Sequence, residues 1–186
     1  METQLASEKH PSLLQDPSTP QRSFFFPQLA LRILAFAAAF AAIFVLHASG
    51  QSVTIAGVEL TAKYYYSSAF KFLLGADVAA CALSLLSLFF VCVFRHTQTK
   101  PKNYFFLILH DMVAMVLLMA GSAAATAIGY VGHNGQDQTA WIAICDQVGK
   151  FCMRVLISII LSYLAFACFF LLAILSAHKL KSSGTK

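Results

Sequence analysis

The sequence predicts an all-α membrane protein, a four-transmembrane-helix bundle with both termini in the cytosol. Three observations support this fold class. The 186 residues are 59% hydrophobic and only 11% charged, whereas a soluble domain carries about 25% charged residues. Four apolar stretches are each long enough to cross a hydrocarbon core of about 30 Å, which takes about 20 helical residues. Lysine and arginine gather on one side of the expected membrane.

The four apolar stretches define one expected membrane domain, residues 24–177. Its spans cover about residues 24–47, 69–94, 104–130 and 153–177. Runs this continuous favour helices over the alternating pattern of a membrane barrel. We expect Ser23 to cap the first helix and Pro27 to lie in its first turn.

The segments outside the spans indicate the orientation. The N-terminal tail, residues 1–23, is polar and punctuated by proline, so we expect it to be disordered; residues 178–186 form a second tail. Eight lysine and arginine residues lie in these tails and in the loop between the second and third spans. Only four lie in the other two loops and the helix ends beside them. The positive-inside rule therefore places both tails in the cytosol and the other two loops outside.

The first exterior loop contains the stretch "QSVTIAGVEL". Its β-branched residues flank Gly57, and such residues favour strands on either side of a turn. The loop therefore predicts a small β-hairpin.

Two opposite charges lie within the expected spans. Arg32 lies nine residues beyond Ser23, and Asp111 lies eight residues beyond Asn103. Because the first and third spans run in the same direction, both side chains reach a depth of about 12–13 Å at 1.5 Å per residue. Either charge is unfavourable at that depth without a partner. The sequence therefore predicts an intramembrane charge pair between Arg32 and Asp111.

Arg32 has a second interpretation. If the first helix starts at Leu29, the arginine can snorkel to the cytosolic headgroups, since helical side chains lean towards the N-terminus. We prefer the pair because each charge shares its helical face with small residues, which let helix backbones approach closely. These helix-packing residues are Ala35 and Ala39 beside Arg32, and Ser122, Ala125 and Gly129 beside Asp111. The pattern predicts a tight seam between the first and third spans.

A third ionisable side chain, Asp77, lies in the outer half of the second span, with no basic residue at matching depth. A protonated carboxyl, a hydrogen bond to a serine or tyrosine hydroxyl, and a contact with His47 are all compatible with the sequence. The role of Asp77 is left open.

Cys145 and Cys152 fall in the second exterior loop, "HNGQDQTAWIAICDQVGKFC". The exterior is oxidising, so a local disulfide between them can persist there; two free thiols are the alternative. The other three cysteines lie within spans and are expected to act as small apolar side chains.

Charge distribution and motifs argue against several function classes. The pI of about 9.0 reflects basic loops, without the basic stripe and interleaved aromatics of a nucleic-acid-binding protein. His110 and Asp111 are adjacent and project about 100° apart on a helix, so they cannot hold one metal ion together. The sequence has no paired catalytic carboxylates, Ser/His/Asp set or phosphate-binding glycine loop. We therefore expect no enzyme, metal or cofactor.

A small-solute, ion or proton pathway centred on Asp111 is the alternative function, since an intramembrane aspartate beside a histidine is also typical of relays.

Four stretches carry a family resemblance: "LRILAF", "TAKYYYSSAFKF", "LHDMVAMVLLMAGSAAATAIGYVGHNG" and "WIAICDQVGKFC". Over about residues 29–177 the chain resembles the CASP-like proteins of plants. These are relatives of the Casparian strip membrane domain proteins within the four-span MARVEL-like group. Arg32 and Asp111 match the family's intramembrane arginine and aspartate, and Cys145 and Cys152 match its second-loop cysteines.

The resemblance implies a multi-pass scaffold of the plasma membrane that forms homo-oligomers, and hetero-oligomers with related members, in stable lateral patches. Casparian strip members use such patches to recruit lignin-forming enzymes. The first exterior loop of this chain is short and lacks their aromatic-rich stretch. Recruitment of cell-wall-modifying partners is therefore expected only in general terms, and a lignin or barrier role is left open.

Lateral assembly within membrane lipid depends on small residues and a few polar contacts, because no hydrophobic drive brings helices together there. The expected spans offer such residues, and we expect them on the outer faces of the bundle: Ala38, Ala42, Ser84, Ser87, Ser158, Ser162 and Tyr163.

Overall fold

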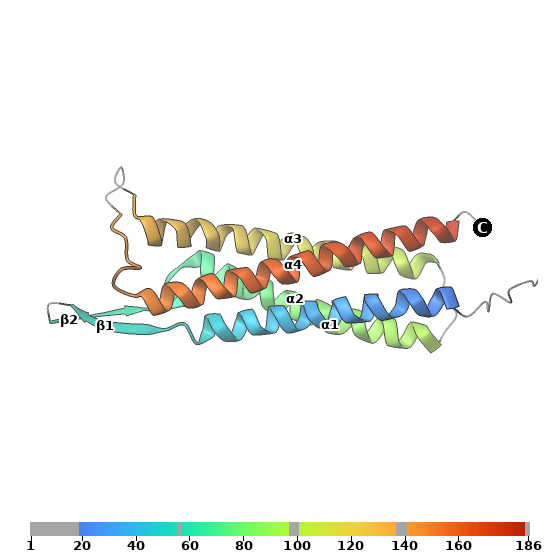
Figure 1. The fold of residues 1–186 in the computed structure, drawn as a ribbon, viewed down its shortest axis with the longest axis horizontal. Helices are drawn as coiled ribbons and strands as arrows, with labels where there is room; N and C mark the ends of the chain where they lie inside the picture. Colours follow the sequence, from blue (N-terminus) through green and yellow to red (C-terminus); the bar gives the residue numbers. More distant parts are fainter. Residues whose placement is uncertain (1–18, 56, 97–100, 137–140, 185–186) are drawn as a thin grey trace, which may run out of the picture.

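Four long helices run side by side in the computed structural model, which describes residues 19–55, 57–96, 101–136 and 141–184. They are α1 (Thr19–His47), α2 (Ser68–His96), α3 (Pro101–Asn134) and α4 (Gly149–Gly184). In Figure 1, α1 begins and α4 ends at the same end of the bundle, opposite a small β-hairpin. All four helices are long and apolar enough to cross a membrane. The predicted bundle of four membrane-length helices is confirmed.

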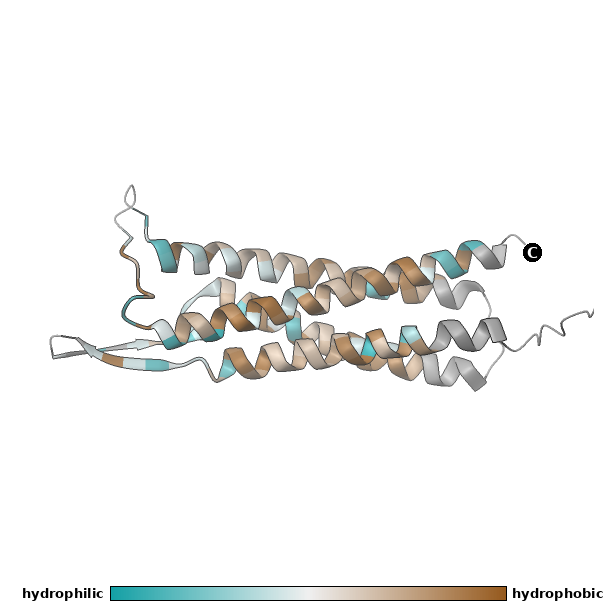
Figure 2. Ribbon diagram, viewed as in Figure 1, coloured by the Kyte–Doolittle hydropathy of each residue, from teal (hydrophilic) through white to brown (hydrophobic). Residues whose placement is uncertain are grey.

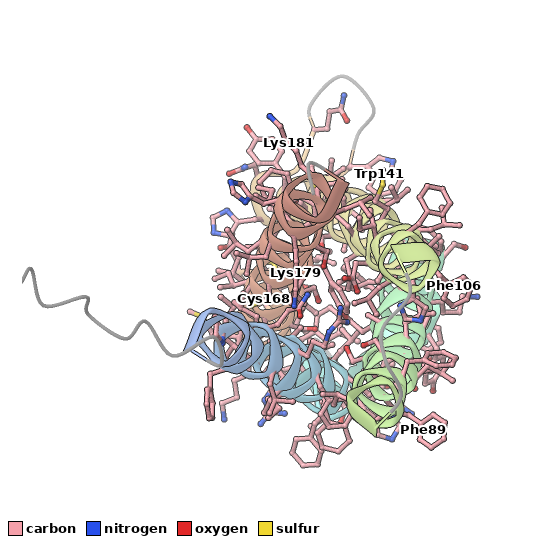
Figure 3. All side chains as sticks on the ribbon, turned by 90° about the vertical axis from the view of Figure 1, so that its right-hand side faces the viewer. Phe89, Phe106, Trp141, Cys168, Lys179 and Lys181 are labelled. Carbon is pink, nitrogen blue, oxygen red and sulfur yellow. A yellow bond between two sulfur atoms is a disulfide. The ribbon has the colours of Figure 1, made fainter. Side chains whose placement is uncertain are left out.

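The helices form a ring in chain order. α1 packs against α2 and α4, and α3 packs against the same two helices, so α1 and α3 face each other across the diagonal (Figure 3). The predicted seam, with the first and third spans packed directly together, is therefore wrong. Equal depth says nothing about position around the ring. Helices that follow each other in the chain usually become neighbours, which places the first and third opposite one another.

The start of α1 also differs from the expected one. The helix begins at Thr19, so Ser23 does not cap it, and residues 19–23 are helical. The rest of the expected disordered tail, residues 1–18, lies outside the described residues. Pro20 suits a helix start because the first N–H groups have no partner within the helix.

Two further helix ends extend beyond the expected spans. α3 continues to Asn134, where Gly135 adopts a positive φ of 70° and its N–H donates to the Val131 carbonyl. This is the left-handed residue that commonly terminates a helix. α4 runs from Gly149 to Gly184 and so includes most of the expected C-terminal tail. A helix makes its own backbone hydrogen bonds and need not stop at the membrane boundary.

The predicted hairpin is confirmed. β1 (Gln51–Ile55) and β2 (Val58–Ala62) pair antiparallel, with Gln51 opposite Ala62 and Ile55 opposite Val58. Gly57 lies in the connecting turn with φ of 84°, a conformation that glycine adopts without steric cost. A short 3-10 turn, η1 (Tyr64–Tyr66), leads from the hairpin into α2.

Buried side chains fill the interior as two layers. The layer nearer the start of α1 combines alanines of α1, α2 and α3 with large residues of α4, Phe169 and Leu172. The layer nearer the hairpin contains Leu46, Phe70 and Phe151. Large apolar side chains such as Phe89 and Phe106 point outward (Figure 3). The middle of each helix is mostly hydrophobic (Figure 2), as expected of a surface that faces lipid.

Close packing of α2 against α3 depends on Gly121. A Cβ atom at this position would lie 3.1 Å from the Ala76 Cβ and 3.2 Å from the Leu73 Cα. A Cβ atom at Gly75, on the exposed side of α2, would meet nothing within 4 Å. The two glycines therefore offer a matched comparison of the same substitution with and without a packing conflict.

Gly121→Val is expected to destabilise the bundle by about 1–3 kcal/mol, the usual cost of overpacking, because the backbone of α2 cannot move away without disturbing the core. Gly75→Val changes helix propensity in the same way but adds its side chain to open space. The unfolding midpoint of each variant in mild detergent measures the difference. Equal losses would contradict the close contact at Gly121.

Candidate functional site

Arg32 on α1 and Asp111 on α3 meet inside the bundle. The arginine Nη1 donates to Oδ1 over 2.9 Å, and Nη2 donates to Oδ2 over 2.8 Å. Both side chains are 0% exposed. Two parallel charge-assisted hydrogen bonds make this a bidentate pair, a strong and geometrically specific arrangement.

The pair joins residues at one depth. Both residues lie within membrane-length segments, Arg32 in Phe26–His47 and Asp111 in Phe105–Asn134, and their side chains are in direct contact. The structure thus brings together the two residues that the sequence pairs, and Arg32 does not snorkel to the headgroups. The arginine side chain crosses the diagonal from α1 to reach the carboxylate.

One polar side chain near the pair, Gln28, went unnoticed in the sequence. Gln28 lies one turn before Arg32 on α1, and its Nε2 donates to the Ser176 Oγ of α4 over 3.0 Å. The spacing of four residues from Arg32 was the available signal, since it places Gln28 on the same helical face. His110 lies with Nδ1 4.0 Å from the Asp111 Oδ1. This polar end of the interior therefore joins α1, α3 and α4.

Asp77 forms a second buried polar cluster, nearer the hairpin. The Ser162 hydroxyl of α4 lies 2.9 Å from its Oδ2, and the same hydroxyl lies 3.0 Å from the Ser158 carbonyl. The Ser158 hydroxyl donates to the Ala42 carbonyl of α1 over 2.9 Å. Of the three arrangements open in the sequence, the structure shows the serine contact; His47 instead meets the Tyr64 hydroxyl at 3.1 Å.

The small residues of the predicted stripes lie at separate contacts. Ala35 and Ala39 are buried in the layer nearer the start of α1. Ser122 is buried, and Ala125 belongs to the other layer. Gly129 is half-buried, and a Cβ atom there would lie 4.0 Å from the Ile159 side chain of α4. These residues pack the ring of neighbouring helices and do not form one seam.

The residues expected to carry lateral assembly lie inside the bundle, which corrects that expectation. Six of them are buried: Ala38, Ala42, Ser84, Ser87, Ser158 and Ser162. Tyr163 is half-buried, with its hydroxyl 3.2 Å from that of Thr126 on α3. Small and hydroxylated residues mark a helix-contact face, but they do not indicate whether the partner helix belongs to the same chain.

Near the hairpin end of the bundle, Cys145 and Cys152 form a disulfide with their Cα atoms 5.7 Å apart. Cys152 lies in the first turn of α4 and not in the loop, because this helix starts at Gly149. The neighbouring Phe151 N–H donates to the Gln51 Oε1 over 2.9 Å, and its ring packs edge-on against Phe70. The bridge thus anchors the second loop to α4, and the Phe151 contacts hold α4 against the hairpin and α2.

An aromatic run outside the spans, Tyr64–Tyr66, follows directly after Lys63. The Lys63 Nζ lies 5.5 Å from the centre of the Tyr65 ring. A hydrogen bond with the Lys63 ammonium lowers the pKa of the Tyr65 phenol and raises the pKa of Lys63. Rings with a polar tip beside a lysine are typical of a membrane–water interface.

Within the described residues, no three His, Cys, Asp or Glu side chains gather as metal ligands would. The four helices long and apolar enough to cross a membrane define a multi-pass membrane protein. Its buried arginine–aspartate pair crosses the bundle, and a disulfide closes the loop at the end opposite the termini.

Comparison with known proteins places this chain in a family. The family model of the Casparian strip membrane protein domain matches residues 21–168. The chain is 50% identical to CASP-like protein 1F2 of Ricinus communis, over 91% of this chain and 85% of that protein. It is 48% identical to CASP-like protein 1F3 of Populus trichocarpa, over 95% and 91% respectively. This chain belongs to the CASP-like family of membrane proteins, as the resemblance predicted. No solved structure matches it.

Proposed function

We propose that this protein is a non-enzymatic scaffold of the plasma membrane that self-associates into lateral patches and recruits cell-wall-modifying partners. The Casparian strip domain supports a scaffold role in the membrane. One observation favours the scaffold over the alternative pathway: Arg32 binds both oxygens of Asp111, and the pair is buried. A carboxylate held in this way is structural, whereas a relay group must exchange its proton or ion.

The orientation is part of the proposal. The eight lysines and arginines of the tails and middle loop favour the cytosol for the end at which α1 begins and α4 ends. The hairpin and the disulfide-closed loop then face the exterior. They are the parts of the chain available to partners in the cell wall.

Lateral assembly uses the outward faces of the helices, because the serines and alanines first assigned to it are buried. The described outward faces present mainly apolar side chains, among them Phe40, Phe89 and Leu171. Association in lipid therefore rests on van der Waals packing between copies. Hetero-oligomers with related family members follow if those members present similar faces.

The scaffold proposal predicts slow lateral exchange in the membrane and more than one copy of the protein in each fluorescent spot. Fluorescent fusions at native expression are expected to recover slowly after photobleaching and to bleach in several steps. A monomeric membrane protein of similar size, expressed in the same cells, is the control for diffusion. Free diffusion with single-step bleaching would contradict the proposal.

Flux measurements test the alternative pathway. Purified protein in liposomes is expected to pass no more ions, protons or small solutes than empty vesicles do. Flux that disappears in Asp111→Asn, in a variant shown to fold by its elution profile, would favour the pathway instead.

A further inference from the structure

Asp77 is the second buried aspartate within the spans, and its surroundings differ from those of Asp111. Asp77 is 0% exposed, and it takes part in no ion pair among the described residues. Its Oδ1 is buried without a hydrogen-bond partner. Asp111, in contrast, has both oxygens bound by one guanidinium.

The Ser162 hydroxyl has one hydrogen but two oxygen neighbours, and this decides which protonation state of Asp77 agrees with the geometry. The Ser162 Oγ lies 3.0 Å from the Ser158 carbonyl and 2.9 Å from the Asp77 Oδ2. A serine hydroxyl has a single hydrogen to donate. If Asp77 were a carboxylate, Ser162 would face two acceptors and could satisfy one. If Asp77 carries a proton, it donates to Ser162, and Ser162 donates to Ser158, so both contacts become hydrogen bonds.

The unpartnered Oδ1 leads to the same conclusion. A buried carboxylate oxygen without a donor or a nearby cation is far costlier than the carbonyl oxygen of a neutral acid. Among the described residues, the elements around this level supply no cation within ion-pair distance. The contact from α4 is a serine hydroxyl, α3 packs Gly121 beside Ala76, and the nearest titratable group along α2 is the buried thiol of Cys81, one turn away.

We propose that Asp77 is a proton-binding site within the membrane: a neutral carboxylic acid that donates from Oδ2 to Ser162. The protonated side chain starts a directed run of two hydrogen bonds: Asp77 donates to Ser162, and Ser162 donates to the Ser158 carbonyl. A separate bond lies beside them, from the Ser158 hydroxyl to the Ala42 carbonyl. Together these bonds join α2 to α4 and α4 to α1.

This site holds a proton and does not conduct one. The last acceptor of the run is a backbone carbonyl, which cannot pass a proton onward. The assignment is therefore independent of the scaffold proposal. It gives the two buried aspartates different charge states, one ionised in a salt bridge and one neutral.

Infrared spectroscopy of the protein in ester-free detergent at neutral pH tests the assignment. The C=O stretch of a protonated carboxylic acid lies above the amide I band, where neither carboxylates nor this solvent absorb. Wild-type protein is expected to show one such band, and deuteration is expected to shift it. The absence of the band would overturn the proposal, whatever the variants do.

Two variants test whether this infrared band belongs to Asp77. Asp77→Asn is expected to abolish it while elution and unfolding midpoint stay at wild-type values, because the amide donates to Ser162 in place of the acid. Ser162→Ala is expected to shift the band to higher wavenumber, because the acid loses its acceptor; this measurement stands even if Asp77→Asn does not fold. A band that persists in Asp77→Asn, or does not move in Ser162→Ala, belongs to another group and would refute the assignment.

Discussion

Neutralising either partner of the Arg32–Asp111 pair alone is expected to destabilise the bundle by about 3–5 kcal/mol, because the remaining charge is left buried without compensation. Asp111→Asn and Arg32→Gln should therefore accumulate poorly, reach the cell surface in reduced amounts and unfold earlier in detergent. The loss should be large because both side chains are 0% exposed and neither can reach water without opening the ring.

Exchanging the two partners tests whether Arg32 and Asp111 stabilise the bundle as a pair or independently of each other. Arg32→Asp combined with Asp111→Arg again places opposite charges at one depth, and it is expected to restore part of the stability. Arg32→Met combined with Asp111→Leu removes both charges and is expected to be tolerated better than either neutralisation alone, since an apolar replacement leaves no uncompensated charge. Arg32→Lys keeps the charge but loses the bidentate geometry, so it should fall between wild type and Arg32→Gln. Double variants as poor as the sum of the single ones would refute the pairing.

Asp77→Asn provides a matched control for Asp111→Asn. The same change, aspartate to asparagine, removes a negative charge at position 111 and no charge at position 77 if Asp77 is neutral. Asp111→Asn should therefore be harmful and Asp77→Asn harmless. A generic cost of altering a buried aspartate would affect both variants alike.

Except for the exact helix ends, the sequence was sufficient for features that depend on position along the chain. Apolar length gave the four helices, and the β-branched residues around Gly57 gave the hairpin. The matching depths of Arg32 and Asp111 brought the right two residues together, because depth follows directly from residue number at 1.5 Å per residue. The family followed from short motifs around these same residues.

Position around the bundle could not be obtained in this way. A helical wheel gives the relative directions of side chains on one helix, but it does not identify the neighbour that they face. For this reason Ser158 and Ser162 were placed on the outer surface, although both hydroxyls are used inside. For the same reason Arg32 was expected at a direct contact of two helices, although it crosses the diagonal. The contact between Ser162 and Asp77 spans 85 positions in the sequence, with no charge complementarity to reveal it.

Loss of the disulfide between Cys145 and Cys152 is expected to have the other large effect. In the chain-entropy description, a bridge that closes a loop of this length, with a sequence separation of 7, contributes about 2–3 kcal/mol. Cys145→Ser and Cys152→Ser should each lower the free energy of unfolding by this amount and so lower the unfolding midpoint. The double variant should lose no more than either single one, because only one bond is removed. Non-reducing mass spectrometry should find the linked peptide in wild type. Free alkylatable thiols at both positions in fresh membranes would contradict it.

Reduction of the wild type provides the control for these variants and also tests the proposed orientation. A reductant should lower the wild-type midpoint to that of Cys145→Ser and should leave the variants unchanged. Cys81→Ala, which alters a buried free thiol, should respond to reductant as wild type does. In intact cells, a membrane-impermeant reductant should open the bridge if the second loop faces the exterior, because both cysteines are only half-buried. A bridge that resists the impermeant reagent but yields to a permeant one would place this loop, and the hairpin beside it, on the cytosolic side and reverse the orientation proposed for the bundle.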